Sequence, residues 1–311
     1  MTALIYDDIF LKHDTGYGHP ENSERLENTI KYLKESGLWE KLQVMKPRAA
    51  SMEEIGLVHP QTYIKAVKQI ADTGGGWLDG DTVVSSESYN AAIYAAGAPL
   101  TAIDLIMKDG GKNAFCLIRP PGHHATPTRG MGFCLFNNAA IAAKYVQLKY
   151  RMERILIIDW DVHHGNGTQD AFYNDPTVLY FSMHRFPFYP GSGRKEEDGH
   201  DKGKGFNINI PLSADIMPKK YIELFTDVME HRVSQFIPEF IIISAGFDTY
   251  KKDHIGGLNL NIEDFGVLTE IVMKSTERYS NGRIVSCLEG GYNLSDLPLC
   301  IEAHLKALLQ V

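Results

Sequence analysis

Residues 159–173, DWDVHHGNGTQDAFY, combine three aspartates, two histidines and a Gly-Asn-Gly turn directly after an apolar run. Asp161 and His163 are two positions apart, so in an extended backbone their side chains point the same way. With Asp248, which ends another apolar run, they could form a metal site of three protein ligands and one open position. The alternative is that Asp161 and His163 only cap the helix expected after the turn, since carboxylates are favourable at a helix start.

Two other motifs, RPPGHH and EGGY, carry residues suited to acid–base chemistry. Side chains of adjacent residues diverge in an extended segment, so His123 and His124 are not expected to bind one ion together. An imidazole pKa near about 6.5 suits general acid–base catalysis beside a metal, and the alternative is an exposed pair on a turn. Tyr292 follows two glycines, which can aim a phenol at a developing oxyanion. The alternative for Tyr292 is a place in the core.

Seven short apolar runs alternate with longer amphipathic segments and would position these motifs. Several runs are apolar throughout, which is typical of parallel strands buried on both faces. Amphipathic helices are expected over residues 20–37, ending at Gly37, and over 219–236 and 262–279. The expected strands are residues 3–7, 114–118, 154–161, 178–184, 206–212, 240–248 and 283–291.

This alternation predicts one α/β domain around a mainly parallel sheet. Ligands of open α/β sheets bind at the carboxyl ends of the strands, and the polar motifs follow four of the runs. We therefore expect their side chains to meet in one site. Residues 190–205 lack a large apolar side chain and are expected to form an exposed loop.

The composition narrows the class of protein. The chain has 311 residues, 44% of them hydrophobic, and a formal net charge of -8, which is unlike a dedicated nucleic-acid binder. We see no secretion signal and no apolar run that approaches the length of a membrane span, so a cytoplasmic protein is expected. Scattered cysteines favour buried thiols in a reducing compartment. They are Cys116, Cys134, Cys287 and Cys300.

Together these motifs resemble those of zinc-dependent histone deacetylases and their prokaryotic relatives, including acetylpolyamine amidohydrolases, in the arginase–deacetylase superfamily. The resemblance covers nearly the whole chain, and the sequences of the motifs RPPGHHA and DWDVHHGNGTQ are most similar to those of class II enzymes. It implies a single domain over residues 1–311 with a central, mainly parallel eight-stranded sheet flanked by helices on both faces. The motifs, in the family's order, are HDTGYGHPENSERL, RPPGHHATPTRGMGFCLFNNAAIAA, ILIIDWDVHHGNGTQDAFY, SMHRFPFYPGSG, SAGFDTYKKDHIGGL and LEGGYNL.

The resemblance also implies the roles of the site residues. Asn166 stands where class I enzymes have an aspartate, so the second histidine, His124, is expected to be less basic. Some class IIa relatives have histidine in place of the catalytic tyrosine, which this chain keeps. By this resemblance, the metal ligands are Asp161, His163 and Asp248, and the tandem histidines are His123 and His124. The carboxylate that orients the first histidine is Asp159, and the tyrosine that polarises the substrate carbonyl is Tyr292.

The resemblance implies an acyl-lysine tunnel and two potassium sites as well. Gly132 and Phe133 match one tunnel wall, Tyr189 stands where a second phenylalanine is usual, and Ile255 stands where the rim has leucine or methionine. Most potassium contacts in the family are backbone carbonyls, so residue type tests them weakly. The inner site corresponds to Asp159, Asp161, His163, Ser182 and Met183, and the outer one to Phe172, Asp175, Val178 and Phe206.

The expected reaction is metal-assisted hydrolysis of acetyl-lysine or another acyl-lysine in proteins or peptides. Zn²⁺ is the expected ion, although the same donors could hold Fe²⁺, Co²⁺ or Mn²⁺, and a structural K⁺ is expected beside it. Because two aspartates offset the charge of the ion and weaken its effect on the pKa of water, a nearby base becomes more useful, and His124 is the candidate. No nucleic-acid or membrane partner is expected.

Four other functions stay open at this stage. An acetylpolyamine deacetylase is disfavoured because the rim residue Ile255 is apolar, although the acidic residues 196–198 could reach a cationic tail. A deacylase of other acyl groups or of a small molecule is a second possibility. A dimanganese ureohydrolase would need a DAHxD spacing that DVHHGNG lacks. A non-catalytic acyl-lysine binding module is disfavoured by the full set of His123, His124 and Tyr292.

Overall fold

The structure is a computed structural model of the chain, and it describes residues 2–310. Over that range one α/β domain is built on an eight-stranded parallel sheet of order β2-β1-β5-β10-β9-β6-β7-β8, which confirms the predicted fold class. A small antiparallel hairpin joins β3 and β4. The strands are β1 (Thr2–Ile5), β2 (Gln43–Met45), β3 (Gly75–Trp77), β4 (Val83–Ser85), β5 (Asn113–Cys116), β6 (Ile155–Asp159), β7 (Val178–Arg185), β8 (Asn207–Leu212), β9 (Phe240–Ala245) and β10 (Ile284–Leu288).

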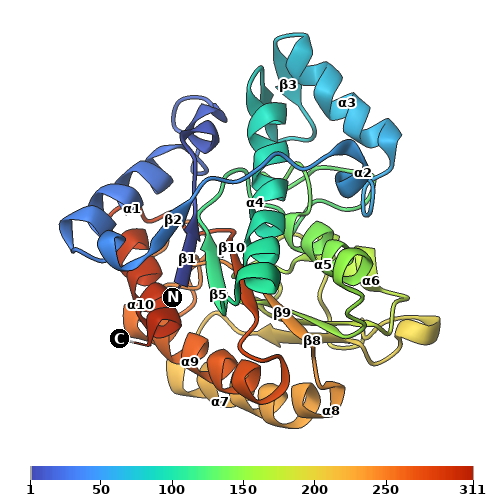
Figure 1. The fold of residues 1–311 in the computed structure, drawn as a ribbon, viewed down its shortest axis with the longest axis vertical. Helices are drawn as coiled ribbons and strands as arrows, with labels where there is room; N and C mark the ends of the chain where they lie inside the picture. Colours follow the sequence, from blue (N-terminus) through green and yellow to red (C-terminus); the bar gives the residue numbers. More distant parts are fainter. Residues whose placement is uncertain (1, 311) are drawn as a thin grey trace.

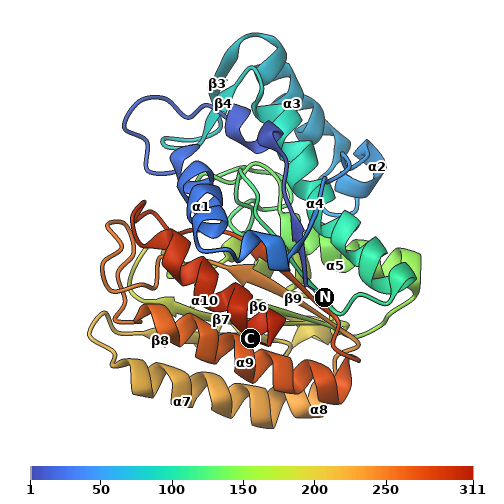
Figure 2. The same cartoon turned by 60° about the vertical axis from the view of Figure 1, so that its left-hand side comes forward.

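Helices cover both faces of the sheet (Figures 1 and 2). Helices α4 and α5 lie on one face, whereas α9 and α10 lie on the other, with α7 packed along α9. The α-helices are α1 (Glu24–Glu35), α2 (Met52–Ile55), α3 (Gln61–Asp72), α4 (Ser88–Asp109), α5 (Asn138–Tyr150), α6 (Asn166–Phe172), α7 (Pro218–Val228), α8 (Ser234–Phe236), α9 (Ile262–Tyr279) and α10 (Leu297–Leu309). The remaining helical turns are η1 (Asp8–Lys12), η2 (Trp39–Lys41), η3 (Asp201–Gly203) and the π-helical η4 (Met229–Val233).

The three predicted helices are present, with small differences at their ends. The first begins at Glu24 rather than at residue 20, and Gly37 follows it at φ 71, a left-handed conformation that favours glycine at a helix end. The second is α7, continued by η4 and α8, and the third is α9 over the predicted residues. The predicted strands were also found, whereas β2, β3 and β4 were missed because they are three residues long and partly exposed.

Helix α4 corrects the expectation that no apolar run approaches the length of a membrane span. By length and composition its segment Ser88–Lys108 could cross a membrane, with a mean hydropathy of 1.3. The same segment is 61% buried inside the protein, and α4 packs against β1, β5 and β10. A helix enclosed by other elements is apolar around its whole circumference, so its place over the sheet accounts for this composition.

Residues 190–205 form the predicted loop, with half of its residues exposed, but polar contacts tie it to the domain. The carboxylate of Glu197 accepts hydrogen bonds from the backbone N–H of Gly193 and of Arg194, each at 3.0 Å. The side-chain amide of Gln169, in α6, donates to the same carboxylate at 2.8 Å. The prediction considered apolar side chains alone, but polar contacts hold this segment to the domain.

One row of the sheet is polar from β9 through β6 and β7 to β8, although it is buried. Residues that are partners in register on parallel strands point to the same face, and this row lies at or near the carboxyl ends of its strands. It therefore forms the floor beneath the motifs that follow the strands. From β5 across to β8 the row consists of Cys116, Cys287, Ser244, Asp159, Ser182 and Asn209.

Candidate active site

Asp161, His163 and Asp248 bring one ligand atom each to a common point beyond β6 and β9. Nδ1 of His163 lies 3.0 Å from Oδ1 of Asp161 and 3.2 Å from Oδ2 of Asp248. The three ligand atoms all lie within 4.8 Å of one another. Donors at about 2.0–2.2 Å from a tetrahedral ion are separated by roughly 3.3 Å, so this spacing suits one metal ion. The helix-capping alternative is not what the structure shows, since α6 has no side-chain cap.

Backbone groups and glycines hold the two carboxylates in place. The N–H of Val162 donates to Oδ1 of Asp248 at 2.8 Å. The N–H of Gly290 donates to Oδ2 of Asp161, also at 2.8 Å. A Cβ atom on Gly290 would lie 2.2 Å from Oδ2 of Asp248, and one on Gly246 would lie 2.2 Å from Oδ2 of Asp161. Glycine is therefore required at both positions, because any side chain would displace a candidate ligand.

The charges at this point favour a cation. Burial, followed by the neighbouring Asp161 carboxylate, raises the pKa of Asp248 to about 7. Burial opposes a charged His163, but its hydrogen bond to Asp161 and the charges of the Asp161 and Asp248 carboxylates outweigh burial and raise the pKa to about 9. Both pKa shifts arise because two buried carboxylates lie close together and favour a positive charge between them. A proton or a metal ion can supply that charge. Oδ2 of Asp248 is buried and has no hydrogen-bond partner, so it is available as a ligand.

His123 and His124 are each fixed through Nδ1, by different partners. Nδ1 of His123 lies 3.0 Å from Oδ2 of Asp159, and Nδ1 of His124 lies 2.8 Å from Oδ1 of Asn166. An amide oxygen only accepts hydrogen bonds, so a neutral His124 carries its proton on Nδ1. Its Nε2 is then free to accept a proton.

The two histidines differ in charge. Burial opposes a charged His123, but the carboxylates of Asp159 and then Asp161 outweigh it and raise the pKa of His123 to about 10. Burial, followed by the charges of His123 and His163, holds the pKa of His124 well below its usual value. The pair therefore combines one cationic imidazole with one neutral imidazole.

The rings of this pair do not diverge as predicted. Their centroids are 4.0 Å apart, with 43° between the ring planes. The prediction assumed an extended backbone, whereas the N–H of Ala125 donates to the carbonyl of Gly122 at 3.0 Å and closes a turn. Side chains on a turn do not alternate between two faces, so the rings of two adjacent residues can lie against each other.

Tyr292 lines the same cavity as His124 and His163 rather than being enclosed in the core. Its backbone N–H donates to Oδ2 of Asp253 at 2.6 Å, and Gly291 adopts φ 122, which a residue with a side chain rarely adopts. Burial holds the pKa of Tyr292 well above its usual value. The phenol therefore stays protonated and can donate a hydrogen bond.

The predicted tunnel residues surround a cavity of about 230 Å³. This volume is below the roughly 300–1,000 Å³ of common ligand pockets and suits a single linear chain. A Cβ atom on Gly132 would lie 2.5 Å from Cδ2 of His124 and 3.1 Å from Cε1 of Tyr189, so the tunnel wall has no room for a side chain there. The lining residues are Asp81, His124, Gly132, Phe133, His163, Phe188, Tyr189, Ile255 and Tyr292.

Two of these lining residues were not predicted. Phe188 stacks on His163, with ring centroids 5.2 Å apart and 13° between the planes. It precedes the predicted Tyr189, and both rings face the cavity because the segment is a loop. Asp81 places a carboxylate at the cavity, which the rim was predicted to lack. Burial, followed by hydrogen bonding to Asp79, raises the pKa of Asp81.

Three buried side chains that support the site were also missed. The hydroxyl of Tyr180 donates to Oδ2 of Asp159 at 3.0 Å. The guanidinium of Arg25 lies 4.9 Å from the ring centroid of Tyr292. Glu289 accepts hydrogen bonds from the turn that carries the histidines. All three stand in or beside motifs already singled out, but nothing in the sequence indicates their distant partners.

The residues predicted to hold potassium lie along β6, β7 and the segments beside them. Asp159 and Ser182 are register partners in the sheet. The carbonyls of Phe172 and Phe206 each accept one backbone N–H, both at 2.9 Å, and a carbonyl oxygen retains a second acceptor position. The potassium sites stay a prediction.

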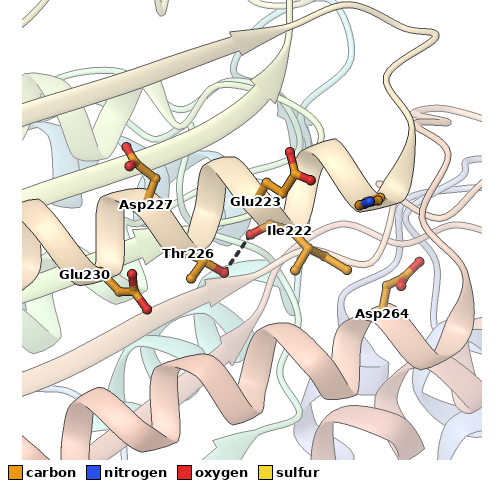
Figure 3. Close-up of a pocket in the computed structure, with 7 residues that line it drawn as sticks. Ile222, Glu223, Thr226, Asp227, Glu230 and Asp264 are labelled. Atoms are coloured by element: carbon orange, nitrogen blue, oxygen red, sulfur yellow. Dashed lines mark hydrogen bonds between the residues drawn. The ribbon is translucent and has the colours of Figure 1, made fainter.

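A larger hollow lies elsewhere, between α7 and α9 (Figure 3). Its volume is about 610 Å³, and its carboxylates come from α7, from η4 and from the start of α9. No histidine or cysteine lines it, so its size does not make it a catalytic site. We call this hollow the acidic groove. It is lined by Lys219, Ile222, Glu223, Thr226, Asp227, Glu230 and Asp264.

Comparison with known proteins connects this geometry to one family. Residues 19–308 match the family described as histone deacetylase domain. The chain is 39% identical over 296 residues to a probable deacetylase of Archaeoglobus fulgidus, covering 94% of this chain and 82% of that protein. It is 34% identical over 327 residues to the histone deacetylase-like amidohydrolase of Pseudomonas aeruginosa, covering 99% and 86%. The solved HDA15 HD domain superposes with a TM-score of 0.94 at 36% identity, covering 99% of this chain and 88% of that one.

Proposed function

Because the chain belongs to the histone deacetylase family of hydrolases, we propose that it removes acetyl or other acyl groups from lysine side chains of proteins or peptides, with a bound divalent metal ion. One observation carries the proposal. Asp161, His163 and Asp248 lie beside the histidine pair, and His163, His124 and the buried Tyr292 line one narrow cavity. A module that only binds acyl-lysine would need none of this acid–base chemistry, so catalysis is the better explanation.

The two histidines divide the proton chemistry between them. His124 is the proposed general base, because its lowered pKa keeps it neutral and its Nε2 is free to take a proton from water. His123, with its pKa raised to about 10, supplies a fixed positive charge that Asp159 holds in place. The proton that His124 accepts can then pass to the leaving amine.

Tyr292 is the proposed donor to the acyl oxygen as negative charge develops there. Its hydroxyl stays protonated because burial holds its pKa high. An ion held by the three ligands would supply Lewis acidity toward that oxygen and lower the pKa of water. Zn²⁺ fits the donor set, as would Fe²⁺ or Co²⁺, and we propose K⁺ as a structural ion near Asp159 and Ser182.

Replacing Asn166 by aspartate is expected to move the acidic limb of the pH–rate profile to higher pH. A carboxylate at Nδ1 favours the charged form of His124, so its pKa rises and the neutral base disappears at a higher pH as the solution is acidified. The measurement is kcat/KM between about pH 5 and pH 9 for both proteins, with metal content and Tm as controls. An unchanged profile would show that Asn166 does not set the basicity of His124.

An acetylated polyamine is the second candidate substrate. The Asp81 carboxylate at the cavity could attract a distal ammonium, which favours this candidate. Against it, the rim residue Ile255 is apolar and 37% exposed. Glu197, which had been considered for the same task, is held by its own loop. Acetyl-lysine peptides are therefore proposed as the better substrates.

Replacing Ile255 by glutamate is expected to shift the ratio of kcat/KM for acetylspermidine over an acetyl-lysine peptide toward the polyamine. A second carboxylate at the partly desolvated rim would pair with the distal ammonium, and the shift should shrink at high salt. Val267, on α9, is also 37% exposed and does not line the cavity, so Val267→Glu is a matched control that should leave the ratio unchanged. If both variants shift the kcat/KM ratio equally, the effect comes from net charge alone.

A side-by-side turnover assay tests the proposed function directly. Acetyl-lysine peptides, longer acyl-lysine peptides and acetylpolyamines would be compared on one preparation whose metal content is measured. Turnover that disappears with a chelator and returns with Zn²⁺, Fe²⁺ or Co²⁺ is expected. A fully metal-loaded protein that binds these compounds without hydrolysing any of them would contradict the proposal and leave a binding module.

A further inference from the structure

Glu289 is a buried carboxylate that has no part in the proton chemistry described above. It directly follows β10 and is 0% exposed. Its Oε2 accepts hydrogen bonds from the backbone N–H of Gly122 at 2.7 Å and of His123 at 3.1 Å. Its Oε1 accepts a hydrogen bond from the hydroxyl of Ser244 at 3.0 Å. Both oxygens are therefore engaged, one by the histidine turn and one by the polar row in the sheet.

The turn above Glu289 carries both catalytic histidines. Their rings are held at Nδ1 by Asp159 and Asn166, but these bonds fix only one end of each side chain. The other end is the backbone, where Glu289 holds two successive N–H groups. Position 122 has room only for glycine, because a Cβ atom there would lie 2.5 Å from the backbone nitrogen of Asn138 and clash with it.

We propose that Glu289 is a positioning residue for His123 and His124. By fixing the backbone of their turn on the central strands, it sets where both imidazoles stand relative to the metal ligands. Ser244 contributes by holding the second carboxylate oxygen. The inference rests on the proposed deacylase function. Because reacting groups tolerate little displacement, a small shift of this turn should reduce catalysis without affecting substrate binding.

Two substitutions of similar size separate hydrogen bonding from charge. In Glu289→Gln the amide oxygen can still accept from both N–H groups, and the Ser244 hydroxyl can reverse to accept from the amide nitrogen. In Glu289→Met no acceptor remains, and two buried N–H groups lose their partner. We expect kcat to fall by about 100-fold in Glu289→Met and by no more than about threefold in Glu289→Gln, with KM and metal content unchanged in both.

Glu239 offers a matched control. Its carboxylate also accepts from two successive backbone N–H groups, those of Glu153 at 2.8 Å and Arg154 at 2.9 Å, on a part of the chain that does not line the cavity. Glu239→Met should lower Tm while kcat stays at the wild-type value. If Glu289→Met fails to fold, Ser244→Ala removes one buried hydroxyl and is expected to lower kcat by about three- to tenfold at constant KM.

Hydrogen exchange gives a readout that does not depend on turnover. The amides of Gly122 and His123 should exchange faster in Glu289→Met than in wild type, whereas Glu239→Met should leave them protected. Wild-type kcat in Glu289→Met or in Ser244→Ala, equal losses in the Met and Gln variants, or unchanged protection of the turn would each overturn the inference. A wild-type protein that hydrolyses no acyl substrate would instead contradict the proposed function, and exchange would still show whether Glu289 holds the turn.

Discussion

Asp248→Ala is expected to lose its bound divalent metal and, with it, nearly all activity. The substitution removes one of three ligands. The loss of metal affinity or activity should therefore exceed the roughly 10–100-fold loss seen when a residue that only supports a ligand is removed. Asp248→Asn keeps the acceptor for the N–H of Val162 but loses the charge. Its metal content and activity should lie between those of Asp248→Ala and wild type. Metal content of the purified proteins, measured beside kcat/KM, checks both expectations.

The acidic groove supplies the control for this measurement. Its carboxylates could hold adventitious metal, so Asp227→Ala, on the exposed surface of α7, shows how much of the measured metal belongs there. That variant should keep wild-type activity and at most lose loosely bound ion. A full equivalent of metal and normal turnover in Asp248→Ala would show that the ligand assignment is wrong.

Tyr292→Phe is expected to lower kcat by about 100- to 1,000-fold, the usual effect of removing one donor from an oxyanion site. Only a hydroxyl is removed, so KM, metal content and Tm should change little. Because the pKa of Tyr292 lies well above its usual value, the phenol does not ionise near neutral pH. The loss should therefore be the same across that range.

Tyr250 is a suitable comparison for this prediction. It is 3% exposed, and its hydroxyl donates to Oδ2 of Asp296 at 2.9 Å, away from the cavity. Tyr250→Phe should cost some stability and leave kcat unchanged. If Tyr292→Phe turned over substrate at the wild-type rate, the oxyanion role would have to be given up.

The sheet could be predicted because its central strands are buried on both faces and therefore read as continuous apolar runs. Strands β6, β9 and β10 are buried at every position, and polar site residues stand at or shortly after the end of each. Helix α4 was not among the predicted helices because it is rich in alanine and enclosed by other elements, so no polar face marks it. Strand β2 lies at the sheet edge and is only three residues long, so its two apolar residues do not make a recognisable apolar run.

In the candidate site, the residues that end strands were the ones the sequence could indicate. Asp161 and Asp248 follow apolar runs, and open sheets gather such ends at one edge. The contact between the His123 and His124 rings depends on a turn, which their spacing does not encode. Glu289 was missed because its partners are backbone N–H groups 167 and 166 positions away.

The place of β10 in the sheet also bears on how the protein is made. It is the last of the described strands to be synthesised, yet it lies between β5 and β9 in the middle of the sheet. Until it leaves the ribosome, those two strands each expose a hydrogen-bonding edge, and such edges are prone to aggregation. Tyr292 and Glu289 follow the same strand. A nascent chain therefore completes its central sheet and its candidate active site in one late step, and a stalled chain that ends before β10 exposes unpaired edges and lacks both residues.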